Sequence, residues 1–134
     1  MPVATITGEM FSIAVDGPRA EIRIWRRPDI DSETGARNAA RIADEGMKLP
    51  GRGVRRVLLD VRDAPAVAGP KSTASMSSLM AAWAAAHTRV AILVSDDPIK
   101  VLQFRRIVTE NAPQDARVMT DAAEATKWLA SLST

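Results

Sequence analysis

The chain has 134 residues, 46% of them hydrophobic, and a net charge of +2, a composition that predicts one globular domain with its own core. It contains no cysteine and one histidine, which excludes disulfides, a cysteine nucleophile and metal clusters built on histidine. The 18 basic residues are interspersed with 16 acidic ones and only 4% are aromatic, so nucleic-acid binding is not expected. With no signal-peptide pattern and no apolar run of about 18 residues, we expect a cytoplasmic protein of bacterial type that has no membrane span.

The segment 10–26 has the pattern of a β-hairpin. Apolar and polar residues alternate with period two on both sides of a DGPR turn. In that turn Gly17 can adopt a positive φ and Pro18 fixes its own φ. A helix is expected next, over residues 32–48, with Asp31 or Ser32 as its cap. Its predicted core side consists of small and apolar residues: Ala36, Ala39, Ala40, Ala43 and Met47.

Two apolar runs, at 57–61 and 90–94, form the predicted centre of the sheet. They are rich in Val, Ile and Leu and show little alternation, which is typical of parallel strands covered on both faces. A helix is expected between them. Its apolar stripe has helical spacing and consists of Met76, Leu79, Met80, Trp83 and His87.

The remaining third of the chain predicts helix, strand and helix. Asp96 or Asp97 caps the first of these helices, and Pro98 fits its first turn. A short strand, ARVMT, follows, and Asp121 caps a final helix. The expected core side of the first helix is Val101, Leu102, Phe104, Ile107 and Val108; that of the last is Ala125, Trp128, Leu129 and Leu132.

The predicted order is therefore β-β-α-β-α-β-α-β-α. Alternating strands and helices favour a single α/β domain over residues 1–134, with helices packed on a mostly parallel sheet and an antiparallel hairpin at its N-terminal edge.

Three hydroxyl residues, Ser72, Thr73 and Ser75, lie where the second helix is expected to begin. They have two interpretations. A hydroxyl oxygen can cap the unpaired N–H groups at a helix start, and this accounts for one of the three. Alternatively, they form a surface that a partner binds and a kinase modifies. We therefore take all three as the candidate site.

Acidic residues follow both central strands. Asp60 and Asp63 could form an acid–base pair, but a simpler role for Asp60 is to bind Arg62 or loop amides. Asp96 and Asp97 follow the second run, where a cap is again the simpler role than a metal ligand. No nucleophile motif accompanies His87. We therefore expect no catalytic residues, no metal and no cofactor.

The element order and three sequence pieces, VLLDVRDAP, VAILVSDDP and ARVMTDAAEATKWL, resemble the STAS domain of anti-sigma-factor antagonists, the SpoIIAA-like group of small bacterial proteins. The resemblance covers almost the whole chain. In that family a Ser or Thr at the start of the helix after the third strand is phosphorylated by a partner kinase, and the modified form releases its partner. The family motif is Asp-Ser-Ser/Thr-Gly, where this chain has GPKSTAS; Ser72 is the closest match and Thr73 the next.

The resemblance implies a regulatory protein–protein interaction module that is not an enzyme. Its partner would be a kinase or a regulator of a sigma-factor pathway, and self-association stays open. A similar fold occurs in lipid-binding CRAL-TRIO domains, so the alternative is a binder of a small apolar or lipid-like ligand.

Overall fold

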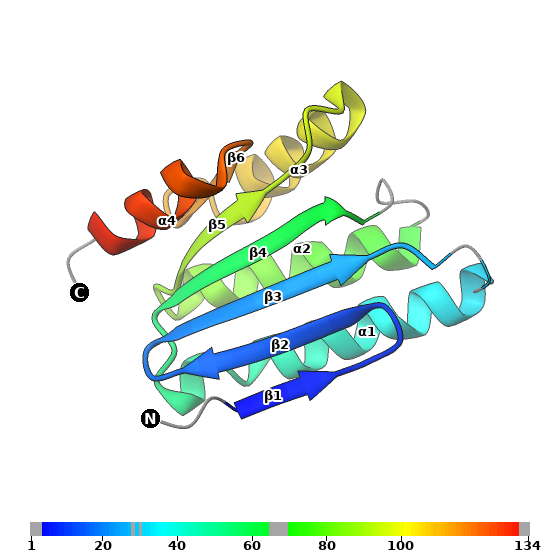
Figure 1. Cartoon of the computed structure of the whole chain (residues 1–134), viewed down its shortest axis with the longest axis horizontal. Helices are drawn as coiled ribbons and strands as arrows, with labels where there is room; N and C mark the ends of the chain where they lie inside the picture. Colours follow the sequence, from blue (N-terminus) through cyan, green and yellow to red (C-terminus); the bar gives the residue numbers. More distant parts are fainter. Residues whose placement is uncertain (1–3, 28, 30, 65–69, 132–134) are drawn as a thin grey trace.

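The structure of the protein, a computed structural model, describes residues 4–27, 29, 31–64 and 70–131. One six-stranded mixed sheet carries four α-helices (Figure 1). The strands are β1 (Ala4–Thr7), β2 (Phe11–Asp16), β3 (Arg19–Trp25), β4 (Arg56–Asp63), β5 (Arg89–Leu93) and β6 (Ala116–Met119). The helices are α1 (Ser32–Met47), α2 (Pro70–Ala85), α3 (Pro98–Asn111) and α4 (Ala122–Ser131), with a 3₁₀ turn at Pro50–Arg52.

The strands lie side by side in chain order, from β1 at one edge to β6 at the other. The expected hairpin is β2–β3, and it joins the same sheet as the two central runs. Those runs are the adjacent parallel strands β4 and β5, as predicted. The sequence prediction missed β1, which pairs antiparallel with β2 and makes it an interior strand. The order therefore begins with three strands instead of two.

Helices α1, α2 and α3 cover one face of the sheet, and α4 covers part of the other (Figure 1). This arrangement follows from the topology, because right-handed crossovers between parallel strands taken in sequential order place every connecting helix on the same side. Only α4, which comes after the last strand, packs on the opposite face, against Leu58, Ala91 and Leu93. That second core is small. It contains residues of β4, β5 and α4, and among the described residues it does not extend over the same face of β1–β3.

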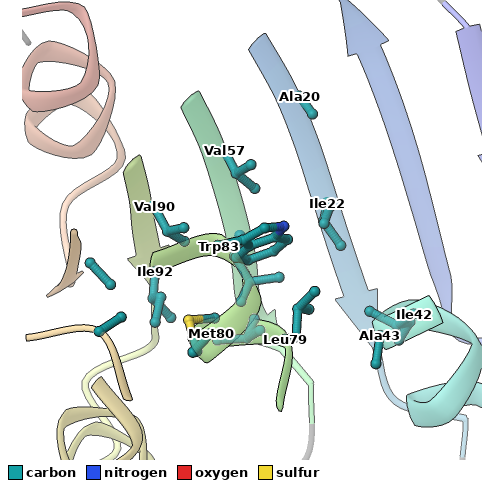
Figure 2. Close-up of a cluster of buried hydrophobic side chains, with 14 of the residues drawn as sticks. Ala20, Ile22, Ile42, Ala43, Val57, Leu79, Met80, Trp83, Val90 and Ile92 are labelled. Carbon is teal, nitrogen blue, oxygen red and sulfur yellow. The ribbon is translucent and has the colours of Figure 1, made fainter. Parts of the chain in front are cut away.

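The main core lies between the sheet and α2. Leu79, Met80 and Trp83 are fully buried and point toward the strands (Figure 2). The indole Nε1 of Trp83 donates a hydrogen bond to the carbonyl oxygen of Gly46, 2.9 Å away. A Cβ on Gly46 would come within 2.8 Å of Leu79. The absence of a side chain at this position therefore lets α1 approach α2 closely.

The core side predicted for α1 is wrong at Ala40, which is exposed, and at Met47, which is 40% exposed. Ile42 and Asn38 are buried instead. The spacing of the alanines predicted a buried face that is rotated about the helix axis from the observed one. An alanine side chain has little apolar area, so the alanines alone do not determine which side of α1 is buried. Asp31 is the cap, since its side chain accepts a hydrogen bond from the Thr34 amide at 2.8 Å.

Two further side-chain predictions are wrong. Leu102 of α3 is 66% exposed, and Lys100 takes a place in the buried face at 5% exposure. His87 lies beyond the end of α2 and is exposed, with a φ of 58°. It ends the helix in a left-handed conformation instead of extending the apolar stripe. Of the stripe predicted for α4, Ala125 and Leu129 are buried, and Leu132 lies outside the described residues.

Candidate functional site

The three candidate hydroxyl residues lie inside α2. The helix begins at Pro70, so Ser72, Thr73 and Ser75 belong to its first two turns. Proline favours the first helical position because its fixed φ suits a helix and its missing N–H would have no helical partner there. The residues immediately before Pro70 lie outside the described part of the chain. The expectation that one of the hydroxyl residues is the cap therefore stays a prediction.

The exposure of the three hydroxyl residues differs. Thr73 is exposed and Ser75 is half-buried, while the side chain of Ser72 lies outside the described residues. Helix α2 has no acidic residue in its first turn. The partial positive charge of this helix start therefore meets no intrahelical carboxylate in that turn.

Lys100 holds the end of the strand that leads toward α2. Its ammonium nitrogen, Nζ, donates hydrogen bonds to the carbonyl oxygens of Val61 (3.1 Å), Arg62 (3.2 Å) and Ala64. Because Lys100 lies in the first turn of α3, this contact links the connections that follow β4 and β5. A buried ammonium needs such acceptors, because burying it unpaired would cost far more than the hydrogen bonds return.

Sequence reasoning missed this role of Lys100 because lysine in a helix usually faces solvent. The signal was its position: the residues at 100, 104, 107 and 108 have the spacing of one helix face, and the other three are apolar.

An ion pair between Asp60 and Arg62 holds the end of β4 on the face of the sheet that α4 covers. The Oδ1 atom of Asp60 accepts hydrogen bonds from the amide N and the Nε of Arg62, both at 3.1 Å, and Oδ2 accepts from Nη2 at 2.9 Å. Next to it, Nη2 of Arg23 donates to Oδ2 of Asp63 at 3.1 Å. The simpler role predicted for Asp60 is confirmed. Its carboxylate is bound on both oxygens, which suits positioning of the chain.

The pKa of Asp60 reflects opposing effects. Burial raises it, while the side-chain and backbone hydrogen bonds from Arg62 and the charges of Arg62 and Arg23 lower it. The lowering effects prevail, so the pKa lies below its ordinary value. A carboxyl group with a lowered pKa in the folded state stabilises the fold above its unfolded pKa of about 3.9, and this contribution is lost as the pH falls through the folded value.

We expect Asp60→Asn to be less stable than the wild type at pH 7 and to lose less of its stability on acidification from about pH 5 to about pH 2. Urea unfolding at a series of pH values measures both effects. Asp44→Asn is the matched control, because Asp44 forms an exposed helical ion pair with Lys48. Parallel pH profiles for wild type and Asp60→Asn would show that the Arg62 contacts contribute no pH-dependent stability.

Asp97 is the cap of α3, as predicted, since its Oδ1 accepts a hydrogen bond from the Ile99 amide at 3.0 Å. Among the described residues there is no group of three or more His, Cys, Asp or Glu side chains placed to bind a metal ion. In the same part of the chain, no helix has the length and apolar character needed to cross a membrane.

Comparison of the chain with protein-family models, with curated proteins and with solved structures finds no match in any of the three.

Proposed function

We propose that this protein is a STAS-like regulatory module that binds another protein through the surface at the start of α2, and that phosphorylation of a hydroxyl residue there switches the binding off. The observation that carries the proposal is the exposed position of Thr73 in the first turn of a 16-residue helix. The sequence resemblance supports it, because α2 is the helix that follows the resembling strand β4.

The contacts at the end of β4, the strand that precedes α2 in the chain, suit a switch. Lys100 binds the carbonyl oxygens of Val61, Arg62 and Ala64 there. A modification at the start of α2 would therefore follow a strand end that is held in place, so its effect would be on the partner more than on the fold.

A phosphate group on Ser72 or Thr73 adds a charge of about −1.5 to −2 near the positive end of the helix dipole. The helix tolerates that charge. A partner packed against a neutral hydroxyl surface does not, since it must either desolvate the phosphate or separate from it.

The packing favours this proposal over the alternative of an apolar ligand. Side chains of α2 fill the layer between that helix and the sheet, with Trp83 fully buried. A surface depression of about 240 Å³ at the β6 edge has a mixed lining, in which Val101, Val118 and Met119 lie beside the charged Arg105, Arg117 and Glu124.

We expect Ser72→Asp to melt within about 2 °C of the wild type and to lose binding to the partner protein. The new carboxylate suits the helix start, where such charges contribute about 0.3–1 kcal/mol. Melting is followed by circular dichroism. Binding is measured by retention of the partner on the immobilised protein, and mass spectrometry of protein from its native cells tests for phosphate on Ser72, Thr73 or Ser75.

Ser78→Asp is the matched control, because Ser78 is an exposed serine of the same helix, two turns further on. It should keep the partner. Equal retention by Ser72→Asp and wild type would contradict the switch, and loss of the partner by both aspartate variants would contradict the placement of the surface at the helix start.

A further inference from the structure

The outer edge of β6 presents backbone groups that can pair with a further strand. β6 is the last strand of the sheet, and in the described part of the chain no strand pairs with it on the side away from β5. On the inner side, the Val90 amide donates to the carbonyl oxygen of Asp115 and the Val94 amide to that of Met119, both at 2.9 Å. Because the backbone groups of successive strand residues face opposite sides, the N–H and C=O groups of Val118 point away from β5.

The depression of about 240 Å³ lies along this edge. Its lining comes from α3 on one side, from β6 and Thr120 in the middle, and from α4 on the other side. Val118 packs against the main core and Met119 against the second core, so the lining continues around the strand edge from one face of the sheet to the other. A chain that paired with β6 would therefore lie in the depression, between α3 and α4.

Three charged side chains of this lining have no ionic partner among the described residues. Arg105 of α3 and Arg117 of β6 are both exposed, and Glu124 of α4 is exposed as well. The guanidinium of Arg117 lies over the Trp128 ring, 5.1 Å from its centroid, a contact that places the cation without binding it to an acid. Arg117 and Glu124 belong to the face that α4 covers, so their charges offset each other there. The excess positive charge is that of Arg105, on the α3 side.

We infer that the β6 edge binds an extended peptide segment of another protein, which adds as a strand and directs an acidic side chain toward Arg105. In strand addition, main-chain hydrogen bonds supply affinity and the alternating side chains supply specificity. The outward N–H and C=O groups of Val118 supply the main-chain bonds. A carboxylate on the α3 side would accept charge-assisted hydrogen bonds from Arg105, while the next side chains of the peptide would meet the balanced pair on the α4 side.

A second copy of this chain fits the edge less well. Antiparallel pairing of two β6 strands about a twofold axis would bring Arg105 and Arg117 of both copies into one interface, where like charges repel. The opposite edge of the sheet, β1, serves as an internal comparison. Its residues are Ala, Thr, Ile and Thr, so it offers backbone groups but no charge that would select an acidic peptide.

The test uses the whole protein and the synthetic peptide acetyl-TVEVT-amide, with binding measured by calorimetry. Acetyl-TVKVT-amide should bind at least tenfold more weakly, because its ammonium meets a like charge at Arg105. Arg105→Gln should weaken the Kd of the glutamate peptide by about tenfold, the effect of one lost charged hydrogen bond. Arg106→Gln is the matched control, since the neighbouring Arg106 is exposed and forms an ion pair with Glu110 at 3.1 Å, and its Kd should equal that of the wild type.

Hydrogen exchange followed by nuclear magnetic resonance locates the peptide. The Val118 amide should exchange more slowly in the complex, and the amides of β1 should not change. Slowing in β1 instead of β6 would overturn the placement, and equal Kd values for the two peptides, or for Arg105→Gln and wild type, would overturn the acidic character of the partner. No heat of binding at about 1 mM peptide, which corresponds to a binding free energy weaker than about −4 kcal/mol, would overturn the site.

Sedimentation distinguishes a peptide from a second copy as the occupant of this edge. The protein should sediment as a monomer with and without the peptide. A dimer that the peptide dissociates would assign the edge to self-association and overturn the proposal. The β6 edge shares no residue with the surface at the start of α2, so this site and the proposed function can fail separately.

Discussion

Replacing Lys100 with methionine should lower the free energy of unfolding by about 2–4 kcal/mol, because it leaves carbonyl groups without their donor in a buried site. Methionine keeps much of the apolar stem but cannot donate to the carbonyl oxygens of Val61, Arg62 and Ala64. Urea unfolding measures the change. Hydrogen exchange should also quicken at the amide of Ala64, which donates to the Val61 carbonyl oxygen at 3.2 Å.

Lys48→Met is the control for this change. Lys48 is half-exposed and forms ion pairs of 3.4 Å with Asp44 and Glu45. Such surface pairs contribute little, so the variant should remain within about 0.5 kcal/mol of the wild type. If Lys100→Met were as stable as Lys48→Met, the ammonium would not be what holds the end of β4. The start of α2 would then follow a strand end that is not held in place by Lys100.

The elements that the sequence predicts well are those whose cause is local. The runs that became β4 and β5 are unbroken apolar segments, and the caps of α1 and α3 use side chains within three residues of the amides they bind. Strand β1 has no such cause. It has four residues and one large apolar side chain, Ile6, and its conformation depends on pairing with β2. That pairing is a contact between strands, which no local pattern contains.

The candidate site divides in the same way. The placement of Ser72, Thr73 and Ser75 at the beginning of α2 was predictable, because a Pro/Gly-rich loop and a helical stripe enclose them. The contact between Arg23 and Asp63 was not predictable, because the two residues are 40 positions apart in the chain and meet only through the pairing of β3 with β4. Lys100 shows a third case, in which the helix periodicity contained the answer but the residue type pointed to solvent.

We expect the second large effect at Trp83. Trp83→Ala should cost about 3–5 kcal/mol, because the side chain is fully buried between α2 and the sheet and leaves a cavity that its rigid surroundings cannot fill (Figure 2). Its backbone oxygen accepts a hydrogen bond from the Thr88 amide at 2.9 Å, a contact that the alanine variant can keep, so the expected loss comes from the side chain. Unfolding in urea, followed by circular dichroism because the variant lacks the reporting indole, measures the loss.

Trp83→Phe separates the packing of the ring from its hydrogen bond. Phenylalanine keeps an aromatic ring but cannot donate to the carbonyl oxygen of Gly46. It should therefore cost about 1.5–3 kcal/mol, between the wild type and the alanine variant, because a smaller ring leaves part of the space empty and the buried acceptor unpaired. If Trp83→Phe were within about 0.5 kcal/mol of the wild type, neither the hydrogen bond nor the larger ring would join α1 to α2. The close approach of the two helices at Gly46 would then rest on the missing Cβ of Gly46 and its contact with Leu79.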